Sequence, residues 1–392
     1  MKITFIRSNT NAVGEYRVKH PMLALQALGH QCDLITLDKG GLRVSNAELA
    51  GDLLVLQRQT SDTVFELLDT LPADMRPKTV YEVDDNPWEW HSWDPIHTEL
   101  GFEYGKRVRE VMGRCDAVTC STPTLAMRIR REFPAMPIWV VPNAIDYQVR
   151  DWSAVEDREA AGTSNNLVLG WTGSVHHTRD GQALLQALPT IFDAYPETLF
   201  LMQCCQSVYG EWTRQYKLQE YKDRLRWVPP LAFVQHPTIY SLFDINLAPL
   251  ERTKFNACKS DLRLIEGGAH GVPYVASRIE PYVDFHRQSG GIGGYLASTP
   301  TEWVTGIANL LDGEREARGQ SLGRYVRETR SLAMVVGQWQ AAFSAVVGGS
   351  EGPSVASLAE PSRNAPCGCN SGLKHKRCCG RAWSFELCKG EQ

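Results

Sequence analysis

The stretch FDINLAPLERTKFNACKSDLRLIEGGAHGVPYVAS (Phe243–Ser277) decides the fold of this chain. It begins with an apolar run that predicts a buried strand and continues through a polar loop into a helix from about Ser260 to Ala269. It ends in a second apolar run, GVPYVAS, which predicts another strand. Strand, helix and strand in this order are typical of a parallel sheet that helices cover on both faces.

The same alternation recurs along most of the chain and predicts two α/β domains. The first is expected over residues 1–150 and the second over 165–320, with a polar linker between them. A helix over about 325–347 has apolar residues at helical spacing and is assigned to the first domain. The expected fold is two Rossmann-like, doubly wound domains that face a cleft. Strands are predicted at 3–6, 32–37, 52–57, 79–85, 115–122, 137–143, 166–173, 198–205, 224–229, 243–250 and 271–277.

Composition and charge exclude several classes of protein. The chain has 392 residues, 43% of them hydrophobic, and a formal net charge of -4, which argues against a uniformly basic nucleic-acid-binding protein. No apolar run approaches the roughly 18 residues of a membrane span. The first apolar run ends at Ile6, which is too short for the core of a signal peptide. A cytoplasmic protein is therefore expected.

The cysteines gather near the C-terminus. Four of the eleven, Cys367, Cys369, Cys378 and Cys379, fall within thirteen residues as C-x-C and C-C. Four thiolates can close a tetrahedral zinc site, and a closed site is structural. The alternative is four unrelated, reduced cysteines. A Gly- and Ser-rich linker is expected at 348–365 and a compact zinc element at 366–383.

The string PCGCNSGLKHKRCC resembles the SEC-C motif, a small zinc element at the tail of the bacterial translocation ATPase and of many other proteins. The resemblance covers about residues 366–380 and implies structural zinc and a docking role toward proteins or nucleic acid. Residues 361–392 carry six Lys or Arg against two Asp or Glu, although such a tail can also be simply a solvated surface.

Two loops of the second domain have the residue types of a nucleotide site. GWTGS (Gly170–Ser174) follows a strand, and its small residues allow a ligand to approach the backbone. In the second segment, PLERTKFNACKSDLRLIEGGAHGVPYVAS, Lys259 at the entry of the helix can pair with a diphosphate, and Glu266, nearly two turns into that helix, can accept two ribose hydroxyls. The alternatives are a surface lysine and a buried carboxylate that caps the region of Gly267 and Gly268.

Several segments together resemble the GT-B glycosyltransferases, in particular the large family of retaining, sugar-nucleotide-dependent enzymes. The resemblance extends over about residues 1–345 and implies transfer of a sugar from a nucleoside diphosphate to a hydroxyl without a catalytic metal. That family usually has two glutamates eight positions apart. Glu266 matches the second of them, but Cys258 occupies the place of the first. The matching segments are GEYRVKHP (14–21), VYEVDD (80–85), CDAVTCST (115–122), VVPNAID (140–146), GWTGSVHHTRD (170–180) and FNACKSDLRLIEGGAHGVPYVAS (255–277).

The resemblance assigns roles to individual residues. Arg17 and Lys259 are expected to stabilise the leaving diphosphate, which makes them the catalytic residues of a retaining enzyme. If the enzyme inverts, Asp84, Asp85 or His91 is the expected base. The expected donor-binding residues are Gly14, Gly173, Ser174, His177, Asn256, Lys259, Ser260 and Glu266.

Three points stay open in the sequence. Asp84 and Asp85 suggest a metal site, although a structural or acceptor-side role is favoured. Trp88, Trp90 and Trp93 either stack on an acceptor or anchor their loop in the core. The chain is also compatible with a non-catalytic scaffold carrying a zinc docking tail, or with a phage-type DNA glycosyltransferase. Its acidic charge weakens the last reading.

Overall fold

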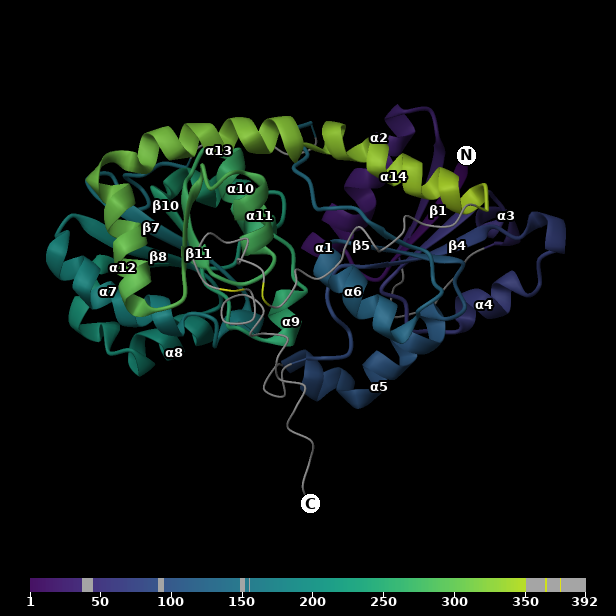
Figure 1. Cartoon of the computed structure of the whole chain (residues 1–392), viewed down its shortest axis with the longest axis horizontal. Coiled ribbons are helices and arrows are strands. Elements are labelled where there is room, and N and C mark those ends of the chain that lie inside the picture. The colour runs from purple at the N-terminus through teal and green to yellow at the C-terminus, as the bar shows by residue number, and fades with distance from the viewer. Residues whose placement is uncertain are drawn as a thin grey trace, which may run out of the picture. The chain divides into compact units, whose positions relative to one another are not determined.

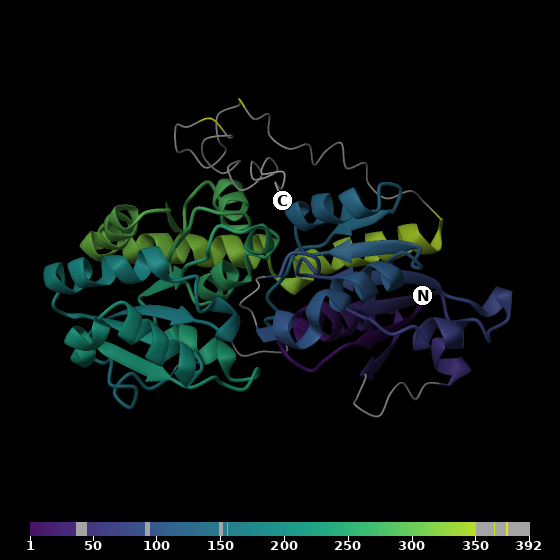
Figure 2. The same ribbon diagram turned by 90° about the horizontal axis from the view of Figure 1, so that it is seen from below.

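The computed structural model describes residues 1–36, 45–90, 95–148, 152–154 and 156–349, together with Asn364 and Lys374. The chain divides into two compact units. The described part of unit 1 comprises residues 1–36, 45–90, 95–146, 258–260 and 330–349. The described part of unit 2 comprises residues 147–148, 152–154, 156–257 and 261–329, together with Asn364 and Lys374. Each unit contains a parallel sheet with helices on its faces, so the predicted α/β class is confirmed (Figures 1 and 2).

Unit 1 is built on a six-stranded sheet in the order β2-β1-β3-β4-β5-β6, with all neighbouring strands parallel. The strand order reverses between β1 and β3, and the carboxyl ends at such a point are where ligands bind in open α/β sheets. The strands are β1 (Lys2–Arg7), β2 (Gln31–Thr36), β3 (Leu53–Gln57), β4 (Lys78–Val83), β5 (Ala117–Cys120) and β6 (Ile138–Val140).

Alternating side chains of this sheet enter two apolar cores. Ile3, Phe5 and Val55 pack with α2 and α14, whereas Leu54 and Leu56 pack with α4, α5 and α6. This alternation is the pleat of a strand buried on both faces. The helices are α1 (Ala12–Gly14), α2 (His20–Ala27), α3 (Asn46–Leu49), α4 (Thr63–Leu68), α5 (Pro95–Met112), α6 (Pro123–Glu132) and α14 (Leu332–Val347), with a π-helix at Glu15–Lys19 between α1 and α2 and a short 3-10 helix at Ala73–Met75.

Unit 2 has a second six-stranded parallel sheet, in the order β12-β11-β10-β7-β8-β9. Its order reverses between β7 and β10, the strands that carry the two loops singled out in the sequence. The last strand, β12, has no counterpart among the predicted strands. The strands are β7 (Leu167–Thr172), β8 (Thr198–Gln203), β9 (Leu225–Val228), β10 (Ile245–Ala248), β11 (Tyr274–Ser277) and β12 (Gly294–Ala297).

The two faces of this second sheet differ. Ile245 and Leu247 point into the core formed with α7 and α12. Asn246 points the other way, where its Nδ2 donates to the carbonyl of Arg263 at 2.8 Å and lies so close to Gly267 that a Cβ there would sit 2.5 Å away. The helices are α7 (Gln182–Ala194), α8 (Gln206–Gln215), α9 (Lys254–Ala257), α10 (Leu262–Ala269), α11 (Tyr282–Gln288), α12 (Pro300–Asn309) and α13 (Arg315–Thr329), with 3-10 helices at Val175–His177, Leu218–Arg224 and His236–Leu242 and a π-helix at Leu310–Glu314.

Two sequence expectations change at the ends of these helices. The helix expected from about Ser260 begins at Leu262. A separate short helix, α9, precedes it and ends at Ala257. Lys259 and Ser260 therefore lie between two helices. The segment expected as one helix over about 325–347 is the end of α13 followed by α14, with a break at Arg330 and Ser331.

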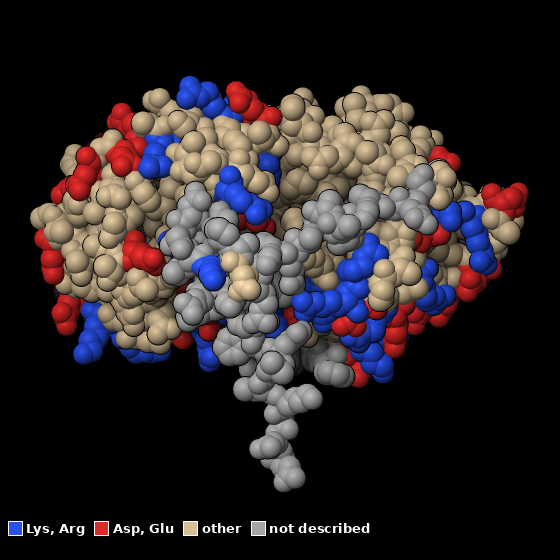
Figure 3. All heavy atoms as spheres, viewed as in Figure 1, with Lys and Arg blue, Asp and Glu red and all other residues tan. Residues whose placement is uncertain are grey.

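Among the described residues, no helix combines the length and the apolar character that crossing a membrane requires. Basic and acidic side chains both occur across the face of the molecule that Figure 3 draws. The four cysteines of the predicted zinc motif, Cys367, Cys369, Cys378 and Cys379, lie outside the described residues, as does the compact element predicted over 366–383 apart from Lys374.

Candidate functional site

Glu266 is a buried carboxylate in the middle of α10, with 5% of its surface exposed. Tyr240 donates a hydrogen bond to its Oε2 at 2.8 Å, and His236 Nε2 lies 3.7 Å from the same oxygen. Both partners come from the turn His236–Leu242, which precedes β10. Burial and the neighbouring carboxylate raise the pKa of Tyr240, so its hydroxyl keeps the proton that it donates. Glu266 is thus a positioned acceptor.

Arg263 lies on α10 one turn before Glu266. Its Nη2 is 3.3 Å from His177 Nε2, and its guanidinium carbon is 5.9 Å from the ring centre of Trp171. Its Nη1 is buried and has no hydrogen-bond partner in the described part of the chain. An unpaired, buried N–H group of a charged side chain is costly, so this atom is suited to receive an anionic ligand.

His177 is oriented by a buried carboxylate. Its Nδ1 lies 2.6 Å from Asp180 Oδ2, while the other oxygen of Asp180 accepts from the Glu251 backbone at 2.8 Å and from Asn256 Nδ2 at 2.9 Å. Because Asp180 needs a proton donor at Nδ1, His177 presents the lone pair of Nε2 toward Arg263 when its ring is neutral. Unit 2 therefore brings three predicted residues close together. His177 and Asn256 share one polar network through Asp180, and Glu266 lies on α10 beside that network.

Gly173 and Ser174 continue the same loop after β7. The Gly173 amide donates to the carbonyl of Gln203 at 3.0 Å, and a Cβ at Gly173 would lie 2.2 Å from the ring of Trp171. The loop can hold only glycine here because the indole fills the space. Ser174 is exposed and starts the short turn that carries His177.

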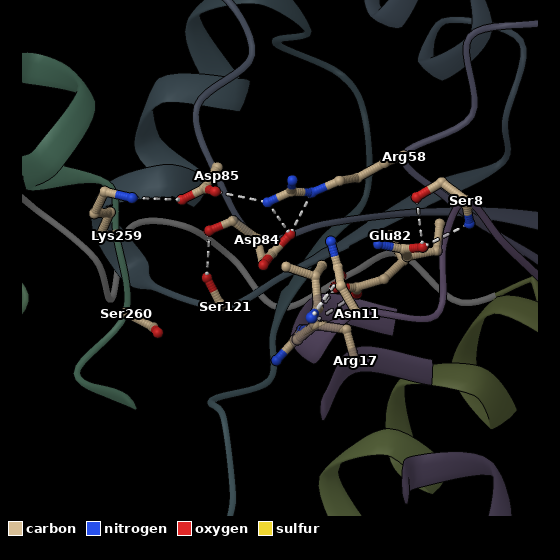
Figure 4. A network of polar contacts seen from close by, with 12 residues as sticks. Ser8, Asn11, Arg17, Arg58, Glu82, Asp84, Asp85, Ser121, Lys259 and Ser260 are labelled. Atoms are coloured by element: carbon tan, nitrogen blue, oxygen red, sulfur yellow. Dashed lines mark hydrogen bonds and ion pairs between the residues drawn. The ribbon is translucent and has the colours of Figure 1, made fainter. Parts of the chain in front are cut away.

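Lys259 and Ser260 pack with unit 1. Lys259 Nζ lies 3.7 Å from Asp85 Oδ1, and Ser260 Oγ accepts from Asn143 Nδ2 at 2.8 Å (Figure 4 shows the first of these contacts). The neighbouring Cys258, which stands where the resembling family has a glutamate, is buried in the apolar core of this unit. Burial raises the pKa of its thiol, so Cys258 is a neutral side chain that cannot replace a carboxylate.

Arg58, which the sequence analysis did not single out, joins the two acidic residues at the end of β4. Its Nε donates to Asp84 at 2.6 Å and its Nη2 to Asp85 at 2.7 Å (Figure 4). Arg58 directly follows β3 and has a φ of 50°, a left-handed conformation that costs free energy in a residue with a side chain. Burial raises the pKa of Asp84, and the positive charge of Arg58 opposes that shift.

Arg17 is enclosed within unit 1, with 1% of its surface exposed. Its Nε donates to Glu82 at 2.7 Å, and its Nη1 donates to the carbonyl of Val141 at 2.7 Å and to Asn143 Oδ1 at 3.0 Å. The guanidinium also stacks 4.8 Å from the ring centre of Trp339. Arg17 is therefore buried and connects β4 to the residues that follow β6. Contact with a diphosphate stays a prediction, and it requires the side chain to leave these partners.

Gly14 and the aromatic loop complete the first unit's predicted residues. Gly14 ends α1 so close to Asn9 that a Cβ would lie 2.1 Å from the Asn9 carbonyl oxygen. Trp88 donates from Nε1 to Gly105 at 3.0 Å and is stacked by Arg128, which favours the anchoring role for this ring. Trp90 meets Tyr104 edge to face. His91 and Trp93 lie outside the described residues.

The sequence analysis did not single out the residues that contact the predicted site residues. Tyr240 and His236 hold Glu266, Arg263 adjoins His177, and Arg58 joins Asp84 to Asp85. Only Arg263 had a signal, because it is three positions before Glu266 and therefore on the same face of a helix.

No protein-family model matches the chain, and no curated protein matches it. Solved structures do. A glycosyltransferase from Rickettsia africae superposes with a TM-score of 0.65 at 12% identity, over 89% of this chain and 99% of its own. A sucrose-phosphate synthase from Thermosynechococcus elongatus has a TM-score of 0.61 at 14% identity, over 89% and 100%. Anabaena HepE, in complex with UDP and glucose, has a TM-score of 0.61 at 14% identity, over 88% and 100%.

At these identities the likeness concerns the fold. The two parallel α/β units are consistent with the GT-B architecture, and the chain spans nearly the whole length of all three structures.

Proposed function

We propose that this chain is a GT-B glycosyltransferase that moves a sugar from a nucleoside diphosphate to an acceptor hydroxyl. The observation that carries the proposal is the buried Glu266, held by Tyr240 and His236 on the helix that follows β10. The carboxyl edge of a parallel sheet is where nucleotides bind in such folds, and a fixed carboxylate can accept both ribose hydroxyls. The fold shared with HepE, solved with UDP and glucose, supports the same reading.

The diphosphate is assigned to Arg263, one turn earlier on α10, and to His177 beside it. Within the residues that the structure describes, the buried Nη1 of Arg263 has no hydrogen-bond partner, and His177 is oriented by Asp180. Ser174, exposed at the start of the turn Val175–His177, is a proposed contact of the phosphates, as is Gly173 before it. Asn256 holds Asp180 in place and acts on the donor through it. Lys259 and Ser260 stay proposed contacts of the phosphates, as does Gly14.

Catalysis in this proposal rests on the leaving group. The bond between the anomeric carbon and the diphosphate oxygen breaks, and negative charge develops on the phosphate. Arg263 and Lys259 stabilise that charge in place of a metal ion. We propose retention, in which the departing phosphate accepts the proton of the attacking hydroxyl. Asp85, which faces Lys259 and Arg58, becomes the base to test if the enzyme inverts.

The C-terminal cysteines are proposed to bind structural zinc. Cys367, Cys369, Cys378 and Cys379 offer four thiolates, the donor set of a closed tetrahedral site. We propose that this element docks the enzyme on a protein or nucleic-acid partner and leaves the chemistry to the two α/β units.

The proposal is tested by incubating the full chain with a panel of nucleotide sugars and measuring the nucleoside diphosphate released. One donor should be hydrolysed slowly by the wild type, and Glu266→Ala and Lys259→Ala should abolish this release. Glu220→Ala, at an exposed position of unit 2, is the matched control and should retain it. Absence of both nucleotide release and nucleotide binding in the wild type contradicts the proposal and favours the scaffold.

A further inference from the structure

Unit 2 contains a pocket of about 320 Å³ at the carboxyl ends of its strands. It is bounded by the connection from β7 to α7, by the residues after β10 and β11, and by the start of α12. A volume near 300 Å³ is at the small end of the range for binding sites of small molecules. The strands concerned are neighbours in the sheet, so their ends converge on one space.

This pocket lies on the opposite side of the sheet from Glu266. Trp303 of α12 and Ala183 of α7 line it, and these two helices pack on the sheet face that bears Ile245 and Leu247. Glu266 belongs to α10, which packs on the face that bears Asn246. Successive side chains of a strand point to opposite faces, so the pocket and the carboxylate proposed for the ribose are separate sites.

Three arginines line the pocket, and they come from three different connections. Arg179 precedes α7, Arg252 follows β10, and Arg278 follows β11. Two acids, Asp180 and Glu251, also line it, and Glu302 lies 3.6 Å from Arg278. Both oxygens of Asp180 already accept hydrogen bonds, from His177 on one side and from Asn256 and the Glu251 backbone on the other. The charge of Asp180 is thus largely compensated within the protein.

The walls of the pocket are held in place. Arg278 donates to the carbonyl of Leu296 at 2.9 Å and lies 3.6 Å from Glu302. Thr299 and Glu302 form a capping box at the start of α12, and the Leu250 amide donates to Ser277 Oγ at 2.8 Å. Gln182 and Gln186, on α7, add amide donors. A wall that combines arginine and glutamine side chains is suited to a tetrahedral anion, because arginine can donate two parallel hydrogen bonds to its oxygens.

We propose that this pocket binds a small phosphate-bearing ligand, at a site distinct from the nucleotide site. The ligand is either inorganic phosphate or a phosphate ester such as a sugar phosphate. The apolar wall formed by Ala183, Leu250 and Trp303 adjoins the cationic one, so an ester has a surface on which to place its carbon skeleton.

The test is calorimetric titration of the full chain with inorganic phosphate and, separately, with glucose 6-phosphate. Each titration is repeated with UDP at saturation, which blocks any phosphate subsite next to Glu266. Binding should persist with UDP present, and tighter binding of the ester identifies it as the source. No binding of either probe at millimolar concentrations overturns the proposal, and so does complete loss of binding when UDP is added.

Variants locate the site independently of the enzyme's activity. Arg179→Gln and Arg278→Gln together should weaken phosphate binding at least about tenfold, since two charged hydrogen-bond donors are lost. Arg179→Gln alone changes an exposed side chain and keeps the test valid if the double variant misfolds. Arg287→Gln is the matched control, because Arg287 pairs with Asp284 on the surface of the same unit.

Unchanged affinity in both Arg179 variants overturns the proposal. If UDP does not bind but phosphate still binds and depends on the arginines, the proposed transferase is contradicted. The proposed phosphate site is supported by the same result.

Discussion

Tyr240 and Glu266 form a buried pair in unit 2, joined by a hydrogen bond of 2.8 Å between the phenol and the carboxylate. The two residues are 26 positions apart and lie on different elements. We expect Tyr240→Phe to lower the free energy of unfolding by about 1–3 kcal/mol, because Glu266 loses a donor inside the protein. UDP affinity should fall as well, since the carboxylate is less well positioned. Urea denaturation and UDP titration measure both effects, and Tyr221→Phe, at an exposed hydroxyl, is the control.

Arg263 should discriminate between a nucleoside and its diphosphate. Arg263→Met removes the guanidinium whose Nη1 has no hydrogen-bond partner among the described residues, so UDP should bind about tenfold to a hundredfold more weakly. Uridine has no phosphates, and its affinity should stay the same. Arg263→Lys should restore part of the UDP affinity. Titration with both ligands measures the split, and an equal loss for uridine and UDP indicates instead that Arg263 holds the site together.

Arg17 should matter for folding above all. Arg17→Met leaves Glu82 buried without its cation and should cost about 3–5 kcal/mol of unfolding free energy. The double variant Arg17→Met/Glu82→Gln should recover much of the loss, since it removes the uncompensated charge. The denaturation midpoints of the single and the double variant show whether the loss of stability comes from the uncompensated charge of Glu82. A fully stable Arg17→Met protein that has lost donor turnover supports the catalytic role predicted from the sequence.

Arg58 combines a strained backbone with two ion pairs. Arg58→Gly and Arg58→Ala both lose the contacts to Asp84 and Asp85, but glycine adopts the left-handed φ of 50° without strain. We therefore expect Arg58→Gly to be more stable than Arg58→Ala by about 1 kcal/mol. Comparison of their urea midpoints tests this directly, and equal midpoints would show that the left-handed conformation relaxes.

The ion pair between Arg58 and Asp84 also predicts that the stability of the protein depends on pH. Burial raises the pKa of Asp84 above its usual range, so its contribution to stability is complete below the unfolded pKa of about 3.9 and is lost as the pH rises through the folded value. Arg58 opposes the shift. In Arg58→Ala the folded pKa rises further, and the destabilisation relative to wild type should grow between about pH 4 and pH 7. A difference that stays constant over this range contradicts the assignment.

The cysteine-rich tail should hold about one zinc ion per chain. Cys367→Ser and Cys378→Ser should each release it, because three thiolates no longer close the tetrahedron. Cys205→Ser changes a half-buried thiol outside the motif and should leave the zinc content unchanged. Colorimetric metal analysis after denaturation gives the count. Equal zinc contents in all three variants contradict the assignment of the ligands.

Local hydrophobic patterns determined the fold class. Leu53–Gln57 is buried along its whole length, as expected for a central strand of a parallel sheet, and the strand predicted at 166–173 is β7. The short β12 lacked such a signal, because its four residues begin with a glycine. Elements such as β3 are recognised by hydrophobic runs and periodicity over neighbouring residues, which the sequence displays directly.

The sequence by itself also determined which residue types could serve a nucleotide. It placed His177 in the loop after one predicted strand and Glu266 in the helix that follows another. Only the tertiary structure decided the partners. It joined Tyr240 to Glu266, Arg58 to two aspartates, Arg17 to Glu82, and three arginines around one pocket. The physical reason is that these pairs depend on which strands become neighbours in a sheet, and strand order comes from the packing of the whole unit.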